Sequence, residues 1–150
     1  MSARRCVAAF KTVYYFAVDR PIEALAAARD IVLEELPPVI GAETAWVLAN
    51  IHGDAGRTEE ALAVGEAGLA MVRTSDAPHL GFNIVDAQVS ALLMAGRVHE
   101  AVDLAERGRV DADDLPGAAH LLGSAIAGRA ALGAGLSMSP ARCWGARRRR

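Results

Sequence analysis

The sequence predicts an all-α protein built as a right-handed stack of antiparallel helix pairs. Residues 55–70 (AGRTEEALAVGEAGLA) join a Gly-Arg turn to an alanine-rich helix, and residues 95–108 (AGRVHEAVDLAERG) repeat that phrase. A weaker copy occupies residues 19–31 (DRPIEALAAARDI). The turn glycines Gly56 and Gly96 are 40 residues apart. The arginines of the weaker copy and of the copy after it, Arg20 and Arg57, are 37 residues apart. A near-constant period of this length is typical of helical repeats.

Small residues recur at spacings of three and four in each copy, so they form one stripe along a helix. The stripe residues are Ala61, Gly65 and Gly68 in one copy and Ala101, Ala105 and Gly108 in the next. A glycine inside a helix costs about 1 kcal/mol relative to alanine. We therefore expect a neighbouring helix to lie too close to this stripe for a side chain.

Each of these helices is preceded by another apolar helix, so the repeating unit is two helices joined by a glycine turn. The predicted helices are residues 5–18, 21–36, 42–53, 58–72, 82–94, 98–108 and 117–134. Pro37 and Pro38 are expected to end the second helix, and Thr58 to cap the fourth. Residues 73–80 and 109–117 read as loops, with Asp113 or Asp114 as a helix cap. The eighth helix is missing, so the last pair is incomplete.

The unit resembles the tetratricopeptide repeat, which places small residues in both helices and a glycine at the turn. Matching positions are Ala49, Gly56, Ala61 and Gly68 in one unit, Gly96, Ala101 and Gly108 in the next, and Gly128 in the last. The period of 37 to 40 is longer than the usual 34 or so. Trp46 is one place out of the family's register, and His52 and Leu92 stand where tyrosine is usual.

The AGR-x-x-EAL phrase and the long loops also resemble the sensor repeats of large ATP-binding transcriptional regulators of the LuxR/MalT type. The resemblance covers residues 5–136 and implies a bacterial, cytoplasmic interaction module with a concave groove for a protein or peptide partner. It implies a fragment without the family's ATPase and DNA-binding parts. We expect one repeat domain over residues 1–136 and a disordered Arg-rich tail over 137–150.

The charge distribution is uneven. The formal net charge is −2, but five of the 16 basic residues follow Ser137, where no acidic residue occurs. The remaining chain therefore has 11 basic and 18 acidic residues, a charge of −7. An acidic body makes nucleic acid an unlikely partner of the repeats. The alternative function is a small nucleic-acid-associated protein that acts through the basic tail.

Catalytic and metal-binding motifs are missing from the sequence. It contains no GxxxxGK[ST], GxGxxG or G-x-S-x-G pattern, and its four histidines are scattered. We therefore expect a non-enzymatic protein with no catalytic, cofactor or metal site. Cys6 and Cys143 form no disulfide motif, which fits a reducing cytoplasm. Residues 117–134 are apolar, but Arg129 argues against a membrane span.

Two apolar groups are expected near the ends of the array. Tyr14, Tyr15 and Phe16 form an aromatic cluster that reads as terminal core. Residues 118–132 lack a second helix to cover them, so we expect self-association through this segment. The residues expected to be exposed there are Leu121, Leu122, Ala125, Ile126, Ala130 and Leu132.

Overall fold

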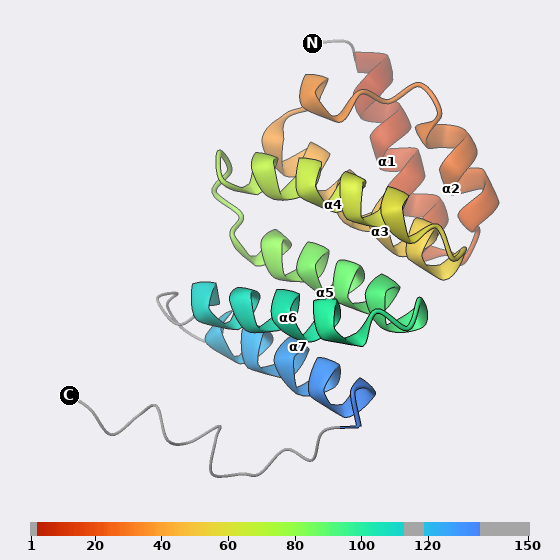
Figure 1. The fold of residues 1–150 in the computed structure, drawn as a ribbon. Helices are drawn as coiled ribbons and strands as arrows, with labels where there is room; N and C mark the ends of the chain where they lie inside the picture. Colours follow the sequence, from red (N-terminus) through yellow and green to blue (C-terminus); the bar gives the residue numbers. More distant parts are fainter. Residues whose placement is uncertain (1–2, 113–118, 136–150) are drawn as a thin grey trace.

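The computed structural model describes residues 3–112 and 119–135, and every regular element in these residues is helical (Figure 1). The elements are α1 (Ala3–Ala17), α2 (Pro21–Ala28), the 3₁₀ turn η1 (Leu33–Glu35), α3 (Pro38–Asp54), α4 (Thr58–Val72), α5 (His79–Met94), α6 (Val98–Ala112) and α7 (Ala119–Gly133). The predicted all-α class with seven α-helices is confirmed for these residues. The predicted tail 137–150 and the cap at Asp113 or Asp114 lie outside them.

The helices form a layered array in which α1 lies at one end and α7 at the other (Figure 1). Each helix packs on the next one along the chain, and short turns make α1–α2, α3–α4 and α5–α6 antiparallel pairs. The odd-numbered helices also pack on one another, α1 on α3, α3 on α5 and α5 on α7. The odd helices thus connect successive pairs.

The same backbone turn ends α3 and α5. Gly56 and Gly96 have φ of +71° and +73°, the left-handed region that glycine enters without steric cost. The N–H of the following Arg57 donates to the carbonyl of His52, at 2.8 Å, and the equivalent N–H of Arg97 closes the second turn. This bond and the glycine conformation define a Schellman cap, which satisfies carbonyls left unpaired at a helix end.

The weaker first copy uses the same cap with an aspartate in the glycine position. Asp19 has φ of +56°, and the N–H of Arg20 donates to the carbonyl of Tyr15 at 2.8 Å. Gly135, after α7, also has a positive φ of +67°. A residue with left-handed φ therefore follows each of the four odd helices.

Glycines set the separation of the paired helices. A Cβ at Gly68 of α4 would lie 2.6 Å from Cβ of Ala45 and 2.9 Å from Cδ1 of Ile84. A Cβ at Gly108 of α6 would lie 3.2 Å from Cγ1 of Val85. Because Ala45 and Val85 are 40 residues apart, like Gly68 and Gly108, the two contacts are one contact repeated.

Gly65 makes room for a buried amide from the next helix pair. The Gln88 side chain of α5 is 1% exposed and donates from Nε2 to the Leu62 carbonyl of α4 at 3.0 Å. A Cβ at Gly65 would lie 2.5 Å from that nitrogen. The amide therefore ties two units together where only glycine leaves space.

The second helix ends eight residues earlier than predicted. α2 stops at Ala28, and the chain turns so that Leu33 and Leu36 pack with Ala9 and Ala45. Burial of these leucines against α1 and α3 outweighs local helix propensity. Pro38 then begins α3, four residues before its predicted start, because proline suits the first turn of a helix.

Other boundaries need correction too. α5 begins at His79 rather than at residue 82. α6 continues to Ala112, so residues 109–112 of the predicted loop 109–117 are helical. Thr58 is the first residue of α4 and not its cap. Arg57 takes that position without a side-chain cap bond, because its backbone already belongs to the Schellman turn.

The aromatic cluster is only partly core. Tyr15 and Phe16 pack against the buried Ala24, Val47 and Ile51, whereas Tyr14 is 62% exposed. Among the described helices, none combines the length and apolar character needed to cross a bilayer.

The Schellman turns predict opposite effects at two equivalent positions. Asp19→Gly should raise the free energy of unfolding by about 0.5–1 kcal/mol, because it removes a strained φ and a negative charge at a helix C-terminus. Gly56→Ala should lower it by about 1 kcal/mol, since no atom lies within 4 Å of a Cβ there and only the φ is strained. Urea unfolding measures both. A destabilised Asp19→Gly variant would contradict the shared turn.

Candidate functional site

Within residues 3–112 and 119–135, no group of three or more His, Cys, Asp or Glu side chains is placed to hold a metal ion. The candidate sites are faces and clefts of the helix array.

The first candidate is a face formed by the odd helices α3, α5 and α7. We define the odd-helix face as Glu43, Trp46, Asn50, Asn83, Asp86, Ser90, Leu122, Ala125 and Arg129. These residues stand 13, 10 and 6 positions before the turn glycines Gly56, Gly96 and Gly135. The α3 and α5 members are half-buried, and the α7 members are exposed. The face is thus in register across three units.

A cleft of about 250 Å³ lies between α5 and α7 on this face. Its lining residues are Phe82, Asn83, Asp86, Leu122, Ala125, Ile126 and Arg129. Arg129 forms an ion pair with Asp86 and donates from Nη2 to the Asp86 carbonyl oxygen at 2.8 Å. This pair holds α7 against α5.

Burial raises the pKa of the Asp86 carboxyl above its ordinary value of 3.8, and the Arg129 guanidinium partly offsets the rise. A raised carboxyl pKa means that folding favours the protonated form. This contribution to stability is present below pH 3.8 and is lost as pH rises through the folded-state pKa.

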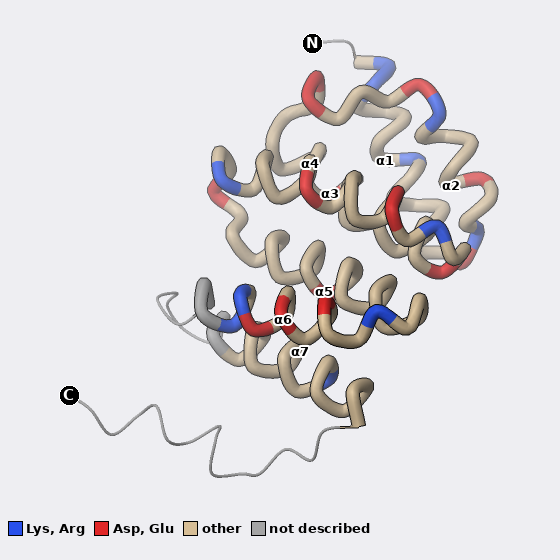
Figure 2. Tube along the Cα trace, viewed as in Figure 1, with Lys and Arg blue, Asp and Glu red and all other residues tan. Residues whose placement is uncertain are grey.

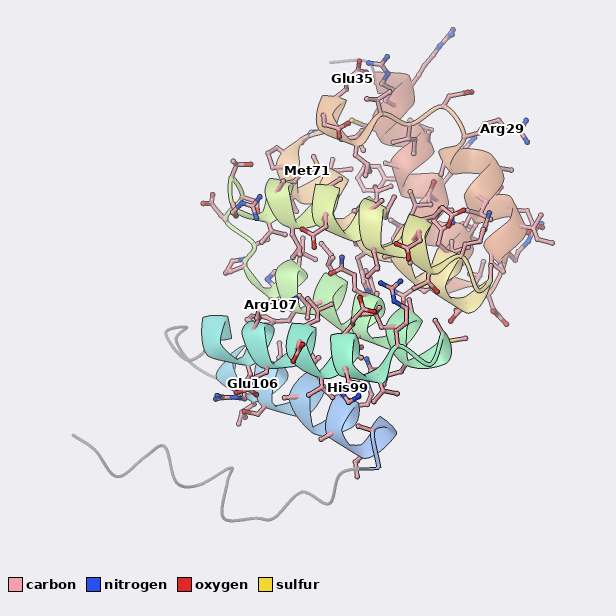
Figure 3. The ribbon with its side chains drawn as sticks, viewed as in Figure 1. Arg29, Glu35, Met71, His99, Glu106 and Arg107 are labelled. Atoms are coloured by element: carbon pink, nitrogen blue, oxygen red, sulfur yellow. The ribbon has the colours of Figure 1, made fainter. Side chains whose placement is uncertain are left out.

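The even helices present a different, charged surface. Acidic residues recur along α4 and α6 (Figure 2), and His99, Glu106 and Arg107 project from α6 (Figure 3). Arg97, at the turn before α6, pairs with Glu100 of α6 and with Glu59 of α4. Ion pairs of this exposed kind contribute little to stability, but they mark where one unit meets the next.

The second candidate is a cleft of about 420 Å³ beside the first two turns, which we call the turn-end cleft. Its lining residues are Phe16, Asp19, Pro21, Ile22, Leu25, Ile51, Asp54, Ala55 and Arg57. The lining combines apolar side chains from α1, α2 and α3 with two carboxylates and one guanidinium. A volume of this size is in the range of small-molecule sites.

His52 lies near the end of α3, and its carbonyl accepts the hydrogen bond that closes the second turn. Burial lowers the pKa of its imidazole below the ordinary 6.5, and the neighbouring Arg57 charge lowers it further, against an opposing effect of Glu60. Its Nδ1 and the Nε of Arg57 are buried without a hydrogen-bond partner. The second turn thus contains two polar groups that the fold does not satisfy.

The predicted repeat positions lie inside the array or in its turns. Ala49, Ala61, Ala101 and Ala105 are buried, Gly65, Gly68 and Gly108 are at helix contacts, Gly56 and Gly96 form turns, and Gly128 is half-buried. Sequence reasoning missed both surfaces described above. The available signal for the odd-helix face was the polar residue six positions before each turn glycine, Asn50, Ser90 and Arg129.

The α7 segment differs from its expected exposure. Ile126 and Ala130 are buried against α5 and α6, at 6% and 0% exposure, so they do not belong to an open patch. Leu121, Leu122 and Leu132 are exposed as expected.

Comparison with known proteins adds no relative. The chain matches no protein-family model, no curated protein and no solved structure. Function must therefore be argued from the surfaces themselves.

The ion pair across the α5–α7 cleft predicts a titration change. Arg129→Met should raise the pKa of Asp86 further, because the guanidinium is the group that opposes the effect of burial. Carboxyl chemical shifts measured by NMR against pH report this pKa. The control is Arg107→Met, an exposed position on α6, which should leave the Asp86 pKa unchanged. An unchanged or lower pKa in Arg129→Met would contradict the pairing.

Proposed function

We propose that the chain is a non-enzymatic protein-interaction module with a tetratricopeptide-like, right-handed superhelical stack. The odd-helix face is the surface that binds a segment of a partner protein. One observation carries the proposal: the odd-helix face lies in the same register before three successive turn glycines, and the residue six positions before each of them is polar, Asn50, Ser90 and Arg129. A face kept in register across units is the usual binding surface of a stacked repeat.

The chemistry of the face suits an extended peptide. The Asn50 and Asn83 amides can donate and accept hydrogen bonds, as peptide backbone groups require. One Asn50 N–H already donates to the Trp46 carbonyl, and the Ser90 hydroxyl donates to the Asp86 carbonyl, so the Ser90 oxygen is left as an acceptor. Trp46 supplies apolar area, and aromatic residues are common anchors in interfaces. The face contrasts with the acidic even helices, which favour solvent over a peptide backbone.

The resemblance to LuxR/MalT-type regulators supports a more specific proposal. In that reading the chain corresponds to sensor repeats in the cytoplasm, which pass a binding event to other parts of a regulator. The sequence itself contains no phosphate-binding GxxxxGK[ST] motif, so ATP binding by that motif is not part of the proposal.

Selection from a random peptide library displayed on phage tests the proposed face. Peptides enriched on the parent chain should bind about tenfold or more weakly to a variant with Asn50→Lys and Asn83→Lys, which loses two amide groups. The matched control carries Ala63→Lys and Ala70→Lys on exposed positions of α4, with the same added charge. It should bind like the parent.

Two results would count against this function. Selection could yield no peptide that binds the parent above background, or peptides could bind both lysine variants equally. Thermal melting of each variant establishes that the compared proteins are folded.

We also propose that two copies associate through α7, within the segment 118–132. Phe82 and Val85 of α5 are buried, and Val85 lies against Gly108 of α6, but the positions 39 residues later, Leu121 and Ser124 of α7, are exposed. The described part of this face carries no unpaired charge, since Arg129 is paired with Asp86. A second α7 is therefore a compatible partner, without charge repulsion.

Sedimentation velocity at several concentrations measures this association. The parent should show a dimer that a variant with Leu121→Glu and Leu132→Glu lacks, because two charges would be desolvated in the contact. The control places Val32→Glu and Val39→Glu on exposed apolar positions at the opposite end and should still dimerise. A monomeric parent would refute the α7 contact.

A further inference from the structure

An arginine follows each of the turn residues Asp19, Gly56 and Gly96, and these three arginines differ in their hydrogen-bond partners. Arg20 donates to Glu23, at 2.8 Å from Nε. Arg97 donates to Glu100, at 2.7 Å from Nε, and also pairs with Glu59. The third of them, Arg57, has a buried Nε without a hydrogen-bond partner. One arginine of an otherwise repeated device is therefore left unsatisfied.

In Arg20 and Arg97 the Nε donates to the glutamate three positions later, and Arg57 has a glutamate there too, Glu60, yet its Nε makes no hydrogen bond. Arg57 also lacks a counterpart of the second carboxylate that binds Arg97. Glu59, which pairs with Arg97, is two positions after the turn arginine of the preceding unit. The same position one unit earlier, two residues after Arg20, is Ile22. An isoleucine cannot accept a hydrogen bond, and Ile22 is 79% exposed. Arg57 therefore has the apolar Ile22 at the repeat position where Arg97 has the Glu59 carboxylate.

Arg57 and Ile22 both line the turn-end cleft. Phe16, Leu25 and Ile51 give this cleft an apolar lining. Asp19 and Asp54 also line it, and they lie at the C-terminal ends of α1 and α3, where the helix dipoles add negative potential. The cleft therefore combines one cationic group, a negative region and an apolar surface.

We propose that the turn-end cleft binds a small zwitterion with an apolar body, the chemistry of an apolar α-amino acid or a short apolar peptide. The ligand carboxylate binds Arg57, as the Glu59 carboxylate binds Arg97. The ligand ammonium group faces Asp19 and Asp54, and the apolar body packs on Phe16 and its apolar neighbours.

Charge complementarity selects a zwitterion over ligands with a single charge. A carboxylate without an ammonium group would meet two aspartates that it cannot neutralise. An amine without a carboxylate would leave Arg57 unpaired next to a second cation. This site is separate from the odd-helix face, and the inference does not depend on peptide binding there.

Calorimetry and backbone NMR on the full chain test the proposal with four probes. L-phenylalanine and L-leucyl-L-leucine should bind with dissociation constants of about 0.1–1 mM and shift the resonances of the cleft. The stronger of the two identifies the source as a free amino acid or a peptide. Phenethylamine and 3-phenylpropionate, each with a single charge, should bind about tenfold or more weakly.

A substitution that restores the repeat provides the sharper test. Ile22→Glu places a carboxylate where Glu59 stands in the next unit, so it should pair with Arg57. The binding of both zwitterions should then become about tenfold weaker or more. The melting temperature should be unchanged or higher, because Ile22 is exposed and an acidic residue suits the first turn of α2. The matched control is Val32→Glu, which should bind as the parent does.

Three results would overturn the proposal: no zwitterion binds the parent, a single-charge probe binds as tightly as its zwitterion, or Ile22→Glu binds like the parent. Since these readouts use small molecules in the turn-end cleft, they are independent of the phage selection on the odd-helix face.

Discussion

The close contact between paired helices at Gly68 is the constraint on which the rest of the array depends. A side chain at Gly68 would collide with Ala45 and Ile84, so the two backbones lie as near as packed helices allow. Larger residues such as Leu62 and Leu69 then fill the space beside the contact. With an aromatic content of only 5%, the interior relies on many short van der Waals contacts between alanine and glycine surfaces.

This constraint also explains why so few polar groups are buried. Thr12 and Thr44 bond to carbonyls one turn earlier in their own helices, so they need no space between helices. Gln88 is the exception, because it reaches across to Leu62 and requires glycine at position 65. Its Oε1 has no partner, which makes this amide a costly way to connect two units.

The parts of the fold that follow local rules could be predicted from sequence. α4 has its predicted bounds, 58–72, because a glycine turn precedes it and its acidic first turn suits a helix N-terminus. α2 begins at Pro21 as predicted, but its end could not be predicted, since it depends on burial of Leu33 and Leu36 against helices distant in sequence. The right-handed superhelix and the kinship with regulators stay predictions.

The candidate sites were harder to predict than the fold. Asn83 and Asp86 read in sequence as interruptions of an apolar helix, and only the turn register aligns them with Glu43 and Trp46. The unsatisfied Nε of Arg57 could not be predicted, because Glu60 stands where Glu23 and Glu100 accept from the equivalent arginines. Residues that define the repeat were therefore evident, while those that distinguish one unit from another required the structure.

The pattern of helix contacts has a consequence for how the chain folds. Every closely packed pair of α-helices joins neighbours or next neighbours along the chain. Short chain separations between contacting residues lower the entropy lost in closing loops, so such proteins fold quickly. Each unit depends only on the units beside it, and the described end at α7 has a neighbour on one side alone. Amide hydrogen exchange should therefore be slower in α3 and α5, which have neighbours on both sides, than in α1, α2 and α7 at the two described ends.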